Sequence, residues 1–178
     1  MRSTLQSLAA LALATFTMTS CSPDDFNSGW DEQIVAQTVT LNQANGNDIS
    51  LGTLNIENEV IDYINENQSD AESFTILSAL PTSGSVASVD LFGLSFVEDL
   101  EVYAVQNGSE ILIGRLTGDI TNTTTSGFEG VDNDLYAFGS TDDIELLLRP
   151  TYNEIGSELT LIDVEIRFAA SFTISGTK

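Results

Sequence analysis

The chain has 178 residues, of which 27 are acidic, five are basic and none is histidine, so its formal net charge at pH 7 is −22. This charge excludes a basic patch that could displace counterions from nucleic-acid phosphates, and it excludes electrostatic attraction to an anionic membrane surface. The lack of histidine removes the commonest general base and the main protein ligand of zinc, copper and non-haem iron. We therefore expect a protein that is not an enzyme and binds no nucleic acid.

The first 20 residues have the layout of a secretory signal. Met1-Arg2 supplies a positive start, Leu8–Phe16 is a short apolar run, and small residues lead to Cys21, the only cysteine in the chain. The apolar run is far shorter than the ~20 residues that a helix needs to span a bilayer. We therefore expect residues 1–20 to be removed by cleavage between Ser20 and Cys21.

The sequence Met18-Thr19-Ser20-Cys21 resembles the lipobox of bacterial lipoproteins, with methionine in place of the usual leucine. The resemblance implies a thioether between the Cys21 sulfur and diacylglycerol, cleavage before Cys21, and fatty acylation (palmitate) of the new amino group. Several acyl chains make a stable anchor, because each buried methylene contributes ~0.8 kcal/mol. The alternative is a free or buried thiol behind a conventional signal peptide, which would leave Cys21 without a disulfide partner.

The residues after the cysteine bear on the membrane in which the protein is anchored. Ser22 stands where an aspartate would resemble an inner-membrane retention signal, and Asp24-Asp25 resembles a short version of the acidic surface-export signal of some Gram-negative lipoproteins. These resemblances imply the outer membrane, and they favour the cell surface over the periplasmic face. The polar composition of residues 21–31 predicts a flexible tether.

Removal of the signal leaves 158 residues, the size of one domain with a sizeable core. The mature chain has 27 acids against Arg115, Arg149, Arg167 and Lys178, a charge of about −23. The acids must lie on the surface and repel one another, so screening salt is expected to stabilise the fold. This balance resembles proteins from saline habitats; an ordinary acidic secreted protein is the alternative.

Between residues 32 and 80 the apolar pattern predicts two strands and one helix. Ile34–Leu41 and Phe74–Leu80 are strand candidates. Ile56–Ile64 has apolar residues at helical spacing, and Glu57 and Glu59 suit the first turn of a surface helix. A strand over Leu51–Ile56 competes with this helix.

The middle of the chain predicts a β-hairpin. Leu100–Val105 and Ile111–Leu116 flank Asn107-Gly108, and Asn-Gly adopts positive φ at low cost in tight hairpin turns. A further strand is expected over Val86–Val97, with a bulge or kink near Phe92-Gly93, where the apolar phase shifts.

The longest strand is expected near the C-terminus, over Leu159–Ile174. Its apolar residues share one parity over many positions, as in a half-buried strand. The members of this series are Ile162, Val164, Ile166, Phe168, Ala170, Phe172 and Ile174. Leu159 and Leu161 are out of phase, which predicts a bulge near Leu161-Ile162. Leu135–Phe138 and Ile144–Arg149 are shorter strand candidates.

Seven or eight strands with polar loops predict an all-β fold. We expect a single antiparallel β-sandwich over residues 32–178, of Greek-key, immunoglobulin-like or jelly-roll outline, with at most one short helix near residues 56–64. This order of strands is similar to that of small all-β envelope lipoproteins, and the likeness implies no activity.

An acidic loop is the best candidate for a ligand site. Asp132, Asn133 and Asp134, with Asp142 further along, offer the hard oxygen ligands that Ca²⁺ takes. The spacing and the distal glutamate of an EF-hand loop are missing, and a solvated acidic turn is the alternative. The threonine-rich segment Ile120–Gly127 predicts a flexible loop, with a recognition loop as the alternative.

Trp30, the only tryptophan, is expected to pack against the sheet edge; a carbohydrate-stacking platform would need it exposed. Together the features predict a lipid-anchored outer-membrane or cell-surface protein with a binding or structural role and a protein or glycan partner. Three alternatives remain: a calcium-dependent or glycan-binding adhesion module, an accessory subunit of an outer-membrane complex, and a hydrolase with a carboxylate pair. Apart from the Ca²⁺ that the acidic loop would take, no cofactor is expected.

Overall fold

The computed structural model describes residues 25–42, 47–88, 94, 96–116, 125–139, 143–152 and 161–178. These residues form eight strands and two short helices. The elements are β1 (Asp25–Asn42), β2 (Ile49–Leu54), α1 (Ile56–Asn67), β3 (Ser73–Ser88), β4 (Val97–Gln106), β5 (Ser109–Leu116), β6 (Thr125–Gly130), α2 (Leu135–Gly139), β7 (Ile144–Tyr152) and β8 (Leu161–Thr177). The all-β class predicted from the sequence is confirmed.

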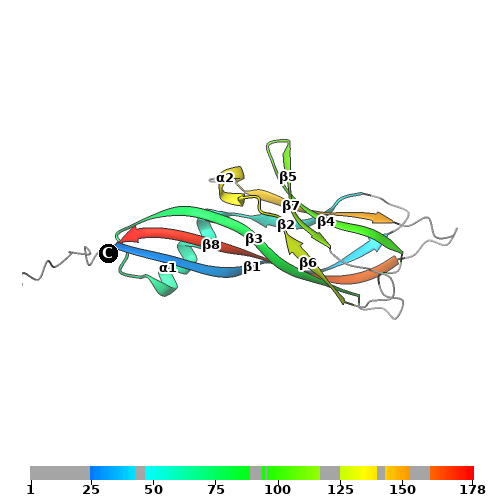
Figure 1. Ribbon diagram of the computed structural model, residues 1–178, viewed down its shortest axis with the longest axis horizontal. Helices are drawn as coiled ribbons and strands as arrows, with labels where there is room; N and C mark the ends of the chain where they lie inside the picture. The colour runs from blue at the N-terminus through cyan, green and yellow to red at the C-terminus, as the bar shows by residue number, and fades with distance from the viewer. Residues whose placement is uncertain are drawn as a thin grey trace, which may run out of the picture.

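The strands form one antiparallel sheet in the order β1-β8-β3-β6-β5-β4-β7-β2. Within it, β4, β5 and β6 are consecutive neighbours, and β3, which precedes them in the chain, lies beside β6. This is a Greek-key arrangement in which the first of the four strands, β3, returns to pair with the last. The outermost strands β1 and β2 approach each other, as shown by the Gln37 side-chain nitrogen, which donates to the Ser50 carbonyl oxygen at 3.3 Å. The sheet therefore curls into a nearly closed, sandwich-like shape. Figure 1 shows the long strands β1, β3 and β8 running along an elongated molecule.

β8 is the central strand of one half of the sheet, between β1 and β3. The predicted series of inward side chains is confirmed, since all seven are at most 2% exposed. The predicted bulge near Leu161-Ile162 is wrong. Leu161 faces Asn42 and Ile162 faces Leu41 without a register shift, and Leu161 is 61% exposed on the outer face. Leu159 lies outside the described residues.

The core consists of aliphatic and phenylalanine side chains, and among the described residues no polar or charged side chain is buried. Phe168 is fully buried in this core and lies against glycines of two other strands, Gly84 of β3 and Gly114 of β5. A Cβ on Gly114 would lie 2.6 Å from the Phe168 ring, and one on Gly84 would collide with the Arg167 carbonyl oxygen. Close contact between the strands therefore depends on these two glycines.

The predicted hairpin is confirmed by β4 and β5. Gln106 pairs with Ser109, and Asn107 and Gly108 between them have φ of 51° and 78°. Positive φ at both central residues is the geometry of the two-residue type I′ turn.

Helix α1 is also confirmed and extends three residues beyond Ile64. Asn55 caps it, since the Asn55 side-chain oxygen accepts from the Asn58 N–H at 3.0 Å. Ile56, Val60 and Ile64 are buried. The strand that competed with α1, predicted over Leu51–Ile56, is present in part as β2, which ends at Leu54, directly before the cap.

Two predicted boundaries are wrong. Residues 25–31, assigned to the tether, form the first part of β1 and pair with β8 from Asp25–Thr177 to Asp31–Ser171. The domain therefore begins at Asp25 rather than at residue 32, and residues 21–24 lie outside the described part. The strand predicted over residues 86–97 is split, since β3 ends at Ser88 and β4 begins at Val97. Phe92-Gly93 lies outside the described residues.

Two further differences concern short elements. The strand predicted at residues 135–138 is instead the helix α2, so the described residues form two short helices rather than at most one. The loop predicted over Ile120–Gly127 is wrong for residues 125–127, which begin β6, a strand paired with β3 on one side and β5 on the other. Residues 120–124 lie outside the described part of the chain.

Candidate functional site

The predicted lipid-attachment residue Cys21 and its neighbour Ser20 lie outside the described residues, so their prediction rests on the sequence. The first described residue, Asp25, pairs with Thr177, and Figure 1 shows the start of β1 beside the C-terminus at one end of the molecule. We call this end the base. None of the helices in the described ranges has the length and apolarity required to cross a membrane.

Two of the predicted calcium ligands of the acidic loop, Asn133 and Asp134, have structural partners. One carboxylate oxygen of Asp134 accepts from the N–H of Tyr136, which caps α2, and from the N–H of Ala79 in β3, both at 2.9 Å. The Asn133 side chain donates to the Leu112 carbonyl at 2.6 Å, and Asp132 is exposed. In the described part of the chain, no group of three acidic, histidine or cysteine residues is arranged to hold a metal ion. Asp142 lies outside it.

A groove between α1 and β1 gathers carboxylates that the sequence analysis did not connect. It has a volume of about 330 Å³. Its lining residues are Glu32 of β1 and Glu59, Asp62, Tyr63, Glu66 and Asn67 of α1. The helix residues recur at three- and four-residue spacing and therefore share one helix face. We call this feature the carboxylate groove.

The charge of the carboxylate groove is not neutralised by a salt bridge within the described residues. Burial, together with the nearby charges of Glu32 and Asp62, raises the pKa of the Glu59 carboxyl. The four basic side chains that the structure describes each pair with an acid elsewhere: Arg115 with Glu101, Arg149 with Asp48 and Glu110, Arg167 with Glu165, and Lys178 with Asp70. The groove is therefore a region of concentrated negative charge.

Beside the groove, aromatic stacking fastens α1 to the sheet. The rings of Trp30 and Tyr63 are 3.7 Å apart and nearly parallel, and Trp30 also stacks on Phe172 at 5.2 Å. The hydroxyls of Tyr63 and Ser28 share a hydrogen bond of 3.1 Å. The prediction that Trp30 packs against the sheet is confirmed. A carbohydrate platform on this residue loses support, because its ring contacts are made within the protein.

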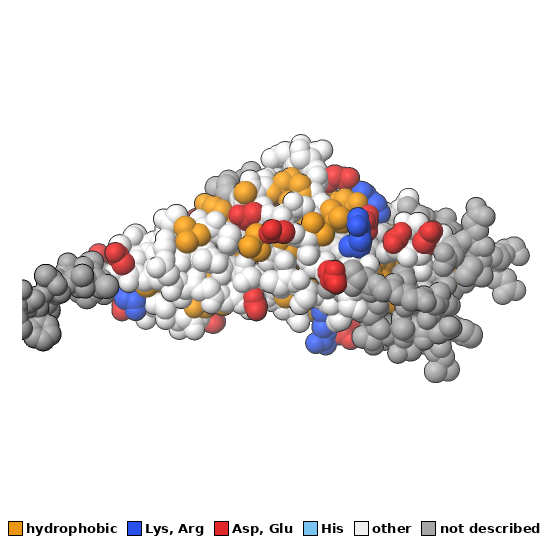
Figure 2. Space-filling model, in the orientation of Figure 1, with side chains coloured by type: hydrophobic (Ala, Val, Ile, Leu, Met, Phe, Trp, Pro, Cys, Tyr) orange, Lys and Arg blue, Asp and Glu red, His pale blue; other side chains and the backbone are white. Residues whose placement is uncertain are grey.

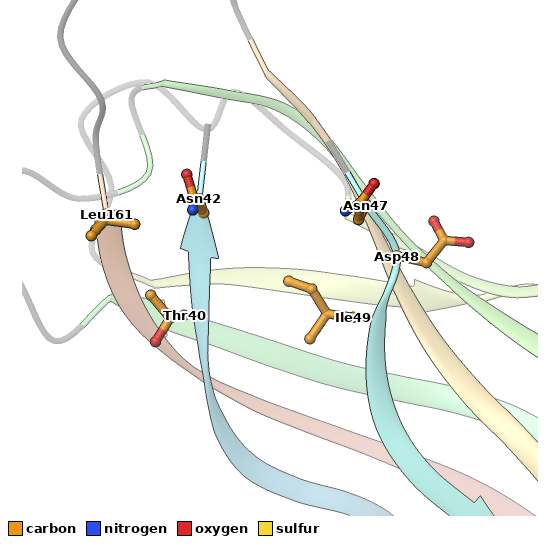
Figure 3. Close-up of a pocket in the computed structure, with 6 residues that line it drawn as sticks. All are labelled: Thr40, Asn42, Asn47, Asp48, Ile49 and Leu161. Atoms are coloured by element: carbon orange, nitrogen blue, oxygen red, sulfur yellow. The ribbon is translucent and has the colours of Figure 1, made fainter. Parts of the chain in front are cut away.

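A second hollow lies at the opposite end of β1 from the base and is drawn in Figure 3. It has a volume of about 290 Å³ between the end of β1 and the start of β2. Its lining residues are Thr40, Asn42, Asn47, Asp48, Ile49 and Leu161. The Thr40 hydroxyl donates to Asp163 at 2.6 Å, and Asp48 is held by Arg149. The hollow offers hydroxyl, amide, carboxylate and aliphatic groups.

An ionic network covers the outer face of β4, β5 and β7. The Arg149 guanidinium lies 4.2 Å from the centre of the Tyr103 ring and contacts Asp48 at 2.7 Å and Glu110 at 3.0 Å. The Tyr103 hydroxyl donates to Glu101 at 2.8 Å. Hydrogen bonds from Arg149 lower the pKa of both Asp48 and Glu110. The network ties three strands to the segment that precedes β2.

Comparison of the chain with protein-family models, with curated proteins and with solved structures found no match. No family can be assigned, and the function rests on the residues and their placement.

Proposed function

We propose that the protein is a lipid-anchored outer-membrane protein, displayed at the cell surface, with a non-enzymatic binding role toward a protein or glycan partner. The observation that carries this proposal is the lipobox-like sequence ending at Cys21, four residues before Asp25. A chain of four residues spans at most about 14 Å. A lipid on Cys21 would therefore hold the base of the domain close to the membrane.

The length of the sheet supports display at a distance from the membrane. β1 has 18 residues, and at ~3.4 Å per residue an antiparallel strand of that length extends about 60 Å. Asp25 lies at the base, and Asn42, at the other end of the strand, faces Leu161. With the lipid at the base, the opposite end of the sheet and its sides are available to a partner outside the membrane.

A binding role fits the described residues better than catalysis does. A carboxylate-pair hydrolase would need acids beside a substrate platform, and the carboxylate groove supplies the acids. The aromatic rings beside it, however, stack on each other and on Phe172. The residues proposed as calcium ligands, Asn133 and Asp134, hold β3, β5 and α2 in place instead.

The anchor is tested by labelling cells that express the full chain with radioactive palmitate. The wild-type chain should incorporate label and partition into the detergent phase, and Cys21→Ala should do neither, because the thioether cannot form. Ser22→Ala is the matched control and should be labelled like the wild type. Label that survives in Cys21→Ala would contradict the proposal.

A further inference from the structure

The outer surface of the sheet differs between the middle of β8 and the strands β4, β5 and β7. Outward side chains of β8 from Asp163 to Ser175 are charged, hydroxyl-bearing or alanine, and the exposed Leu77 of β3 and Leu161 at the start of β8 lie outside this stretch. β4, β5 and β7 instead present four apolar or aromatic side chains outward: Tyr103, Val105, Leu112 and Leu147. These four are half-buried, yet none belongs to the residues that pack against the core. Figure 2 shows hydrophobic side chains gathered over the upper half of the molecule, where Figure 1 places α2, β5 and β7.

The four side chains form one continuous surface, which we call the lateral patch. Tyr103 pairs across the sheet with Leu112 on one side and with Leu147 on the other. Val105 lies two residues along β4 and therefore on the same face. Directly opposed residues of neighbouring strands have Cβ atoms about 5 Å apart, so their side chains touch.

The centre of the lateral patch is held rigid before any partner arrives. Arg149 lies over Tyr103 and is fixed by Asp48 and Glu110, and the Tyr103 hydroxyl is fixed by Glu101. Side chains that are already ordered lose less entropy when they enter an interface. Tyrosine and arginine are also the residue types most enriched among those that dominate binding energy.

The charge around the lateral patch selects the kind of partner. Glu110 and Glu145 are exposed and flank Val105 in the cross-strand register. Asp48 and Glu101 also border the patch, where Arg149 pairs with Asp48 and Glu110 and Arg115 pairs with Glu101, so the acids outnumber the arginines by two. The whole chain carries −22. A second copy of the chain would set acids against acids, whereas a partner with basic side chains would complement them.

We propose that the lateral patch docks a protein whose contact surface has aliphatic side chains ringed by lysine and arginine. The inference rests on the binding role proposed above, and it names the surface and the chemistry of the partner. The patch lies on the side of the elongated domain, so a lipid at the base leaves it accessible.

The test places a photo-crosslinking amino acid in the full-length chain in cells, at Leu112 of the lateral patch or at Ser171 on the outer face of β8. Irradiation should give a discrete adduct from position 112 and none from position 171. The yield of adduct should be lower when cells are irradiated in about 0.5 M NaCl than in about 0.05 M NaCl, because salt screens the charged rim. The crosslinked partner peptide, sequenced by mass spectrometry, should contain lysine or arginine beside aliphatic residues.

Two variants sharpen the test. Val105→Asp should abolish the adduct from position 112, because it replaces an aliphatic contact of the patch with a charge that is costly to bury, whereas Thr173→Asp on β8 should leave it unchanged. The proposal is overturned by the absence of an adduct, by the same adduct from position 171, by an adduct of twice the chain mass, or by an acidic partner surface. Palmitate labelling of each variant reports separately whether the anchor is intact.

Discussion

Glu59 provides a direct test of the electrostatics of the carboxylate groove. Partial burial disfavours its charged form most, Glu32 and Asp62 add like-charge repulsion, and each like-charge contact of this kind costs ~0.2–0.5 kcal/mol. Glu59→Gln keeps the shape of the side chain and removes both contacts. It also removes a favourable interaction with the positive end of α1, of ~0.3 kcal/mol. Because Glu59 is only half-buried, solvent screening holds the gain low, and we expect a net stabilisation of about 0.5 kcal/mol.

The pH dependence of this effect has a fixed sign. The pKa of Glu59 is raised in the folded state, so its ionisation destabilises the fold only as the pH rises through that pKa, and the penalty is absent below the ordinary carboxyl pKa of 4.5. In thermal unfolding followed by circular dichroism, Glu59→Gln should melt ~1–2 °C above the wild type near neutral pH. The difference should shrink as the pH falls to ~5.

Glu57→Gln is the matched control, because Glu57 is an exposed acid of the same helical turn that does not line the groove. It should melt slightly below the wild type at neutral pH, since it loses only the favourable interaction with the helix end. The reasoning is refuted if Glu59→Gln also melts below the wild type, or if its advantage grows toward acid.

Three other predictions concern stability. Gly84→Ala should lower the free energy of unfolding in urea by ~1–3 kcal/mol, because the added Cβ would collide with the Arg167 carbonyl oxygen. Gly127→Ala is the control and should change this free energy little, because its Cβ would meet open space. Equal effects of the two substitutions would rule out the steric cause. Arg149→Met should lower the free energy of unfolding by up to ~1 kcal/mol, chiefly because the ion pair with Asp48 is lost. An unchanged free energy of unfolding would show that the network adds no stability. The unfolding temperature should rise from low salt to about 1 M NaCl, where the Debye length is ~3 Å; a flat curve would contradict the self-repulsion argument.

The parts of the fold that the sequence predicted are those where a local pattern and the tertiary structure agree. β8 alternates over its whole length because one face is buried and the other is not. The β4–β5 turn was predictable because Asn107-Gly108 supplies the positive φ that the turn needs. α1 combines a capping asparagine, acids in its first turn and apolar residues at helical spacing.

Other elements depend on tertiary contacts. β6 contains two glycines and no alternation, and its extended conformation comes from pairing with β3 and β5. Asp25–Asp31 has the polar composition of a tether but is paired along its length with β8. α2 could have been recognised from Asp134 in a capping position before a short apolar run.

The candidate sites divide in the same way. Cys21 is predicted from the sequence alone, and the residues around it carry the whole prediction. The carboxylate groove was missed because its two sides are 27 positions apart, at Glu32 and Glu59. Each side of the groove shows a pattern in the sequence. Glu32 lies at alternate positions from Ser28 and Trp30 and so shares their face of β1, and the acids of α1 recur at helical spacing. Only the fold brings the two sides together.

Mass spectrometry of the mature N-terminus tests the central claim most directly. The full chain would be expressed in a Gram-negative host, extracted with detergent and digested, and the N-terminal peptide measured. The account predicts that this peptide begins at Cys21 and carries diacylglycerol and a further acyl chain. An N-terminus at any other residue, or an unmodified Cys21 thiol, would contradict it.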